Sequence, residues 1–352
     1  MNKLIRILTL TLLISCAYTP CAWSNNTSPY FTIKRIANKD YAIPLVQSDI
    51  HPKVAQRINQ TIQMATVERL YNVVGEGMLF NNLMDENMHG VSNLDYSILS
   101  NTPSVLSIEF CYDTMGAYPD YHIAYLNFNA ATGNILDLSQ LFTSEGVRHL
   151  NDEVSRTLNA SIKSELLNMV TSEGLKKEEI EEQGEVLFQL TECNATHEII
   201  KFGIKEDRII MNKGRCLPHV IQCYDINWTI EMLFKDLYIS YFSTTGQKLL
   251  KEKVPVLTTT YPISSKEISI HGKIDHKYAF TMLLDISSDY IDGRYWYDKN
   301  GVLIEVRAKK FSQNELEIIE EGGKFLIEIN LDGTLSGHWT NNQGKQFPIT
   351  FQ

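Results

Sequence analysis

The last part of the chain repeats one short pattern, and this repeat restricts its fold more than any other feature. Between residues 267 and 352, segments that alternate apolar and polar side chains recur every ten or twelve residues. Four glycine-containing turns, at residues 298–301, 320–323, 330–333 and 341–344, supply the positive φ angles of hairpins. We count eight strands in an antiparallel meander. Because unpaired strand edges favour aggregation, we predict an all-β domain that forms an eight-stranded barrel or a strongly curled sheet.

The preceding part of the chain mixes strand and helix patterns. Residues 104–111 and 121–129 alternate as strands do, and residues 198–211 resemble a pair of strands joined by a turn. A helix that begins at His51-Pro52 and a long helix over residues 144–169 both carry apolar side chains every three or four positions. These patterns favour an α+β domain, in which an antiparallel sheet packs with two main helices.

The length of the chain favours more than one domain. Its 352 residues, of which 43% are apolar, exceed what one ordinary core holds. We divide it into a signal segment at residues 1–24, the α+β domain at 25–242, a linker at 243–266 and the β-meander domain at 267–352. The linker shows few periodic signals and contains two prolines.

The first residues form a secretory signal. Lys3 and Arg6 precede an apolar run at residues 8–14, which is too short to span a bilayer. Cleavage after Ser24 would release a soluble protein into the periplasm or the medium, whereas acylation of Cys16 would give an outer-membrane lipoprotein. We favour the soluble product, because cleavage after Ser24 leaves an even number of cysteines.

The cysteines that remain after this cleavage are candidates for disulfides. Pairing of Cys193 with Cys223 is our first choice, although four cysteines allow three pairings. Spacing alone would also suit zinc, through Cys193 with His197 and through Cys216, His219 and Cys223. Thiols of an exported chain tend to oxidise, so we expect disulfides and no metal. The candidates are Cys111, Cys193, Cys216 and Cys223.

Charge and motifs argue against several classes of function. The net charge is −10, which makes nucleic acid, with its repelling phosphates, a poor partner. We interpret this charge first as a surface property that keeps the chain soluble, and as an alternative it suits a basic partner. The sequence has no Gly-x-Ser-x-Gly elbow, no phosphate-binding Gly-Lys loop and no His-Glu-x-x-His motif. We expect no catalytic residue, no cofactor and no transmembrane span in the mature chain. The oligomeric state is left open.

A series of motifs resembles a known family. A strand at residues 106–110 is followed by a Gly-Ala loop, a strand that ends in Asn-Phe-Asn at 127–129, Thr-Gly at 132–133 and Leu-x-x-Leu-Phe at 138–142. Over residues 30–241, with Asn59 in an Ile-Asn-x-x-Ile pattern, the chain resembles the family of domain of unknown function 3298. This extracytoplasmic domain occurs in a lysozyme-binding anti-sigma factor and in the non-catalytic region of a peptidoglycan deacetylase. The resemblance implies an envelope domain that binds rather than catalyses.

The loop of this resemblance is the predicted binding site. The family's Gly-Ala-His-Gly is here Gly-Ala-Tyr-Pro, a variant similar to that of Gram-negative relatives, and any role of the histidine cannot be carried over. We predict contacts with a lysozyme-like protein or with peptidoglycan, and Tyr118 and Asp120 are the expected anchors because loops are exposed. The predicted binding residues are Gly116, Tyr118, Pro119, Asp120 and Tyr121.

Two alternatives are kept beside the binding module. A small cell-wall hydrolase would use Asp113, Asp120, His122 and His219 as acids and bases, which requires them to lie close together. An accessory protein would hold a small ligand inside the β-barrel, since eight strands can enclose one. The segment at residues 337–344 is similar to part of avidin-type barrels, but this match is short and falls at the wrong end of the domain.

Overall fold

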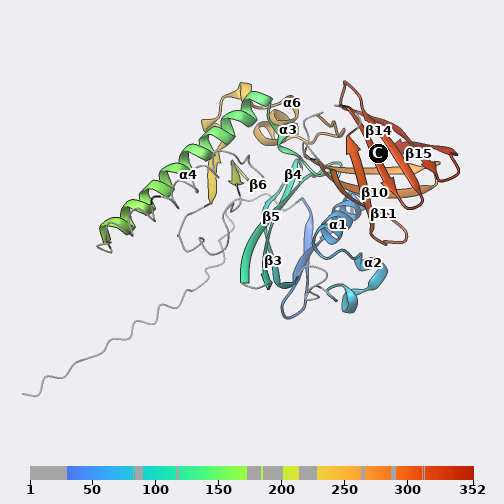
Figure 1. The fold of residues 1–352 in the computed structure, drawn as a ribbon, viewed down its shortest axis with the longest axis horizontal. Helices are drawn as coiled ribbons and strands as arrows, with labels where there is room; N and C mark the ends of the chain where they lie inside the picture. Colours follow the sequence, from blue (N-terminus) through green and yellow to red (C-terminus); the bar gives the residue numbers. More distant parts are fainter. Residues whose placement is uncertain are drawn as a thin grey trace, which may run out of the picture.

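The computed structural model describes residues 30–352, except for 82, 84–89, 116–118, 173–183, 185–200, 214–227, 263–265, 287–290, 311 and 313. An α+β part comes first in the chain and a β-barrel follows, which confirms the predicted fold class (Figure 1). The elements of the first part are β1 (Thr32–Ala37), β2 (Ala42–Gln47), α1 (Pro52–Thr66), α2 (Tyr71–Val74), η1 (Glu76–Met78), β3 (Val91–Asn101), β4 (Val105–Met115), β5 (Pro119–Asn129), α3 (Leu138–Leu141), α4 (Ser144–Ser172), β6 (Lys201–Lys205), β7 (Arg208–Asn212) and β8 (Thr229–Leu233).

The first core lies between a three-stranded sheet and helix α1. Strands β3, β4 and β5 pair antiparallel, and alternate residues of β4 point toward α1. Ile108 and Phe110 of β4 pack with Ile58 and Ile62 of α1, whose spacing places both on one side of the helix. The β1–β2 hairpin completes this core. Asn59 joins the two, because its side-chain amide donates to the Val46 carbonyl at 2.8 Å and accepts from the Val46 N–H at 2.7 Å.

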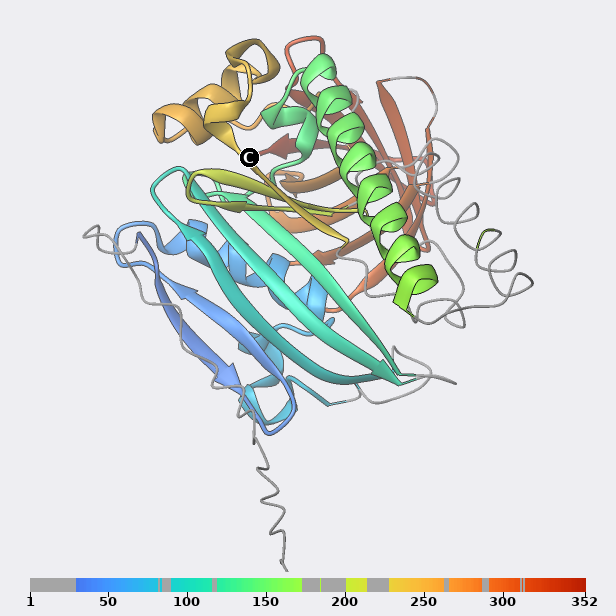
Figure 2. The same ribbon diagram turned by 90° about the vertical axis from the view of Figure 1, so that its left-hand side faces the viewer.

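The second core lies between helix α4 and a small sheet of strands β6, β7 and β8. Leu150, Val154 and Leu158 recur every four residues along α4 and are fully buried. They pack with Ile209 and Met211 of β7, and Figure 2 shows α4 lying along this part of the molecule. The long helix predicted over 144–169 is therefore confirmed, as is the strand pair within 198–211.

The described residues of the predicted linker at 243–266 pack against both parts of the protein. It contains α6 (Thr244–Gly246) and the π-helix η5 (Gln247–Glu252), preceded by the short helices η3 (Phe234–Asp236) and η4 (Ile239–Tyr241). Leu249 and Leu250 belong to the core of α4, and Tyr261 belongs to the core of the barrel part. The segment thus contributes to both parts of the protein.

The barrel closes by pairing its first strand with its last. Its eight strands follow one another around the barrel, and Ile274 of β9 pairs with Ile349 of β16. Closure leaves no strand edge of the barrel unpaired, so the aggregation that open edges favour is avoided. The strands are β9 (Glu267–Ile274), β10 (Tyr278–Ile286), β11 (Ile291–Tyr297), β12 (Ile304–Lys310), β13 (Glu315–Glu320), β14 (Gly323–Ile329), β15 (Leu335–Asn341) and β16 (Gln346–Phe351).

Side chains fill the interior of the barrel. Phe280, Tyr295 and Phe325 are fully buried there, and their ring centroids lie 5.3–5.4 Å apart in successive pairs. Gly293 faces inward between Val306 and Leu284, where a Cβ atom would lie 2.6 Å from a methyl group of Val306. This packing gives the barrel a hydrophobic core and does not favour the alternative of a small ligand inside it.

The outer wall formed by β9, β10 and β11 packs against α1. Trp296, which points outward from β11, is fully buried with Met64 and Leu70. Arg294 on the same wall forms an ion pair of 2.7 Å with Glu68 just after α1. Figure 1 accordingly shows α1 between the β3–β5 sheet and the barrel.

We expect the Asn59 amide to contribute measurably to stability. Asn59→Ala removes both hydrogen bonds to Val46 and should lower the free energy of unfolding by about 1–3 kcal/mol, since buried polar groups lose their partners. Urea unfolding at pH 7 measures this change. Asn72→Ala, at an exposed position of α2, is the matched control, and an equal effect of the two substitutions would contradict the role given to Asn59.

Candidate functional site

The two predicted binding residues with described side chains, Asp120 and Tyr121, lie at one end of the β4–β5 hairpin, on two different faces of the sheet. Gly116 and Tyr118 fall outside the described residues, and the backbone of Pro119 pairs with Met115 at the start of β5. Asp120 pairs with Thr114, whereas Tyr121 pairs with Asp113. Successive residues of a strand point to opposite faces. Asp120 and Tyr121, although adjacent in the sequence, therefore cannot contribute to one flat contact surface.

Asp120 lies on the face that continues the first core. Its carboxylate is 3.6 Å from Nε2 of His122, which also lies 3.2 Å from the hydroxyl of Thr114. The His122 ring stacks on Tyr112, with centroids 5.1 Å apart. This arrangement positions the imidazole by contacts with neighbouring strand residues.

Tyr121 lies on the opposite face, among carboxylates from two strands. Cross-strand pairing places Asp95 of β3 beside Cys111 of β4, and Asp113 of β4 beside Tyr121 of β5. Glu109 of β4 pairs in the same way with the buried Tyr125. We call this surface the acidic sheet face and define it by Asp95, Glu109, Cys111, Asp113 and Tyr121.

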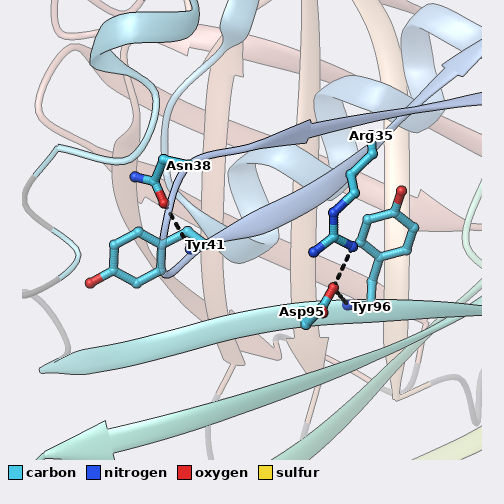
Figure 3. Close-up of polar contacts among 5 residues, drawn as sticks. All are labelled: Arg35, Asn38, Tyr41, Asp95 and Tyr96. Atoms are coloured by element: carbon cyan, nitrogen blue, oxygen red, sulfur yellow. Dashed lines mark hydrogen bonds and ion pairs between the residues drawn. The ribbon is translucent and has the colours of Figure 1, made fainter. Parts of the chain in front are cut away.

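One carboxylate of the acidic sheet face is already neutralised. Arg35 of β1 binds Asp95 at 2.7 Å, and its guanidinium lies 5.5 Å from the centroid of the Tyr96 ring (Figure 3). Burial opposes ionisation of Asp95, but the hydrogen bonds from Arg35 and from the Tyr96 N–H, together with the positive charge of Arg35, outweigh it and hold the carboxyl pKa below its usual value. Among the described residues, no cation lies within ion-pair distance of Glu109 or Asp113, so this face carries unpaired negative charge.

The same surroundings disfavour the ionised forms of the neighbouring groups. Burial raises the pKa of the Cys111 thiol and the charges of nearby carboxylates add to this, against a smaller lowering by the hydrogen bond with Tyr121. Burial and the contact with Cys111 raise the pKa of Tyr121 as well. Cys111 therefore remains a protonated thiol near neutral pH, which makes it a poor nucleophile.

The acid and base residues of the hydrolase alternative do not gather in one place. Asp113 lies on the acidic sheet face, while Asp120 and His122 lie on the opposite face of the same sheet. His219 falls outside the described residues. General acid–base catalysis needs its groups within reach of one substrate, and the described residues of this set do not meet that condition.

Several sequence predictions concern residues that the structure does not describe. The signal segment, Cys16, Cys193, Cys216 and Cys223 are among them, so processing and disulfide pairing stay predictions. Among the described residues, Cys111 of β4 has no disulfide partner. Within the described ranges, no group of three or more potential metal ligands gathers at one place. None of the described helices is long and apolar enough to cross a membrane.

A polar cavity that the sequence analysis missed lies between β2 and α1. Its volume is about 550 Å³, and Gln56, Asn59, Gln60 and Gln63 line it from the helix. Gln60 is 3% exposed, and its amide nitrogen has no hydrogen-bond partner. The glutamines at spacings of three and four residues could have signalled a shared helix face, but not that this face borders a cavity.

A second group that the sequence analysis missed lies on the outer wall of the barrel. His271 of β9 and Thr281 of β10 pair across the strands, with Nδ1 and Oγ1 3.0 Å apart. The Thr281 hydroxyl donates to Asp298 at 2.9 Å. Burial, followed by the positive charge of Arg57, lowers the pKa of His271 from 6.5 to about 3. His271 is therefore neutral at physiological pH.

The burial of His271 predicts a loss of stability in acid. The unfolded chain binds a proton at this residue near pH 6.5, and the folded chain does so only near pH 3. The contribution of neutral His271 to the free energy of unfolding is thus fully present above pH 6.5. It decreases as the pH drops toward 3, by about 1.4 kcal/mol for each pH unit. Urea unfolding at pH 7 and pH 4.5 should show a smaller acid loss in His271→Gln than in the native chain. His276→Gln, at an exposed histidine, is the control and should leave the loss unchanged.

Comparison with known proteins gives structural neighbours and no sequence relative. No family profile and no curated protein matches this chain. A crystal structure of a DUF3298 family protein from Pseudomonas aeruginosa is 8% identical and aligns over 62% of this chain and 94% of its own, with a TM-score of 0.36. A DUF3298 member from Bacteroides fragilis is 14% identical over 63% of this chain and 96% of its own, with a TM-score of 0.34. Both belong to the family that the sequence motifs resemble. Because the identities and the TM-scores are low, these similarities carry no argument about function, and the function of this chain is argued from its own residues.

Proposed function

We propose that this chain is an exported, non-catalytic binding protein of the cell envelope, and that its acidic sheet face receives a basic ligand. The observation that carries the proposal is the unpaired charge of Glu109 and Asp113 beside the exposed ring of Tyr121. An aromatic ring beside unpaired charge is typical of a contact surface, because the ring buries area and the charge selects the partner.

The proposed partner is a lysozyme-like protein. Lysozymes are basic, and the net charge of −10 on this chain would speed their encounter with it. The acidic sheet face adds a local attraction near the end of the β4–β5 hairpin where Met115 pairs with Pro119. Tyr118 keeps its proposed role as an anchor in the predicted loop of residues 116–120.

Support for binding over catalysis comes from the chemistry of the described groups. The Cys111 thiol has a raised pKa, and the candidate acids and bases are divided between two faces of a sheet.

Export through the signal segment, with a periplasmic or secreted product, belongs to the same proposal. Anchoring through Cys16 at the outer membrane is its alternative.

The first test is titration of hen lysozyme into residues 25–352 by calorimetry at physiological salt. We expect saturable one-to-one binding, and at least tenfold weaker binding by the double variant Glu109→Gln/Asp113→Asn, because each lost charge pair is worth about 1 kcal/mol or more. Raising the salt concentration should weaken the native complex more steeply than that of the variant.

The matched control is Glu145→Gln/Asp152→Asn, which removes the same charge from exposed positions of α4. Equal weakening by both double variants would mean that total charge, and not the acidic sheet face, drives binding.

Tyr118→Ala should weaken binding without a lower melting temperature. Absence of binding by the native chain would overturn lysozyme as the partner.

A peptidoglycan fragment is a second candidate, and the cavity between β2 and α1 favours it. Amide side chains donate to and accept from sugar hydroxyl and acetamido groups, and the unpartnered amide nitrogen of Gln60 offers one such donor. Chitotriose should bind with at least fivefold lower affinity to Gln60→Leu than to the native chain. Unchanged affinity, or no binding of this probe to the native chain, would remove the cavity from consideration.

A further inference from the structure

A separate cavity lies where the barrel meets the α+β part. Its volume is about 440 Å³, and it is bounded by α1, by the segment before the barrel and by strands β9 and β16. Arg57, His271 and Tyr261 are its ionisable lining residues, and Leu257, Leu335 and Phe351 give it an apolar side. It is distinct from the acidic sheet face and from the cavity between β2 and α1.

The guanidinium of Arg57 has no counter-ion in this cavity. It donates to the Thr132 carbonyl at 3.3 Å and to the side-chain oxygen of Gln352, both of which are neutral acceptors. In the part of the chain that the structure describes, no carboxylate forms an ion pair with it. Burial lowers the pKa of Arg57, while the more distant Asp298 opposes this. Partly buried cations are normally paired, so this one is suited to a ligand anion.

His271 offers a hydrogen-bond acceptor beside this cation. Because the Thr281 hydroxyl uses its proton toward Asp298, its oxygen accepts from Nδ1–H of His271. The neutral ring then carries a lone pair on Nε2. Nε2 has no hydrogen-bond partner, although His271 is only 3% exposed. A buried acceptor of this kind calls for a ligand that supplies an N–H or O–H group.

The apolar side of the cavity opens toward solvent. Leu257 is 79% exposed at its rim, next to the lining residues Leu335 and Phe351. An exposed leucine at the mouth of a cavity can cover an apolar group of a ligand and gain about 25 cal/mol for each Å² removed from water.

We propose that this cavity binds the carboxyl end of an N-acylated amino acid or short peptide with an apolar last side chain. The carboxylate pairs with the guanidinium of Arg57. The amide N–H of the ligand donates to Nε2 of His271, and its side chain packs on Leu257 and Leu335. The three contacts match the three chemical features of the cavity.

Three related probes test this assignment by calorimetry on residues 25–352. N-acetyl-leucine has the carboxylate, the N–H group and the side chain, 4-methylpentanoate lacks the N–H group, and N-acetyl-leucine amide lacks the charge. We expect N-acetyl-leucine to bind most tightly, 4-methylpentanoate several-fold more weakly and the amide at least tenfold more weakly. Equal affinities for N-acetyl-leucine and its amide would overturn the role of Arg57, and absence of binding by all three would overturn the site.

Two variants separate binding from folding. Arg57→Gln should reduce the affinity for N-acetyl-leucine at least tenfold, whereas Arg156→Gln, which removes an exposed arginine of α4, should not change it. Leu257→Ser alters an exposed residue and should weaken N-acetyl-leucine severalfold without changing the melting temperature. If Arg57→Gln lowers the melting temperature, the Leu257→Ser result decides, and unchanged affinity in that variant would contradict the proposal. Lysozyme binding by Arg57→Gln should remain native, since that interaction involves another face.

Discussion

The wall formed by β9, β10 and β11 is buried on both of its faces, and the arrangement of the rest of the protein depends on it. Its inward side chains form the core of the barrel, while its outward ones meet α1 and the segment before the barrel. Every residue from 268 to 272 is therefore buried, although the strand belongs to a barrel. Outward polar groups on such a wall need partners. Ser269 accepts from the Ile135 N–H at 2.8 Å, and Thr281 bridges His271 and Asp298.

Most of the barrel could be predicted because its signals are local. Glycine in four of the hairpin turns and alternation along the strands act over a few residues, and the meander requires no long connection. The edge strand β3 was not predicted, because polar residues such as Asn93, Asp95 and Ser97 on its exposed face hide its pattern. The packing of the predicted linker could not be foreseen from its sequence, since Leu249 and Leu250 are buried by elements distant in the sequence.

The candidate sites depend on register and packing, which the sequence does not display. Asp120 and Tyr121 are neighbours in the chain but lie on opposite faces of the sheet. Asp95 and Cys111 come from different strands but lie on the same face. The strands β4 and β5 could be predicted from their motifs and Asp113 was a candidate acid, but its grouping with Asp95 and Glu109 on one face could not be predicted. Arg57 and His271 come from different parts of the protein and meet only when α1 packs on the barrel. No local pattern connects them.

The pairing of β9 with β16 also determines when the barrel can form. A chain that emerges from its N-terminal end exposes β9 long before β16, so the edge of β9 has to wait for the final strand. Until then, Ile274 and its neighbours form an open sheet, which is the state most exposed to misassembly. Phe351 lies on that last strand and borders the cavity that holds Arg57. Completion of the junction between the two parts is therefore a late event in folding, coupled to the arrival of the last residues.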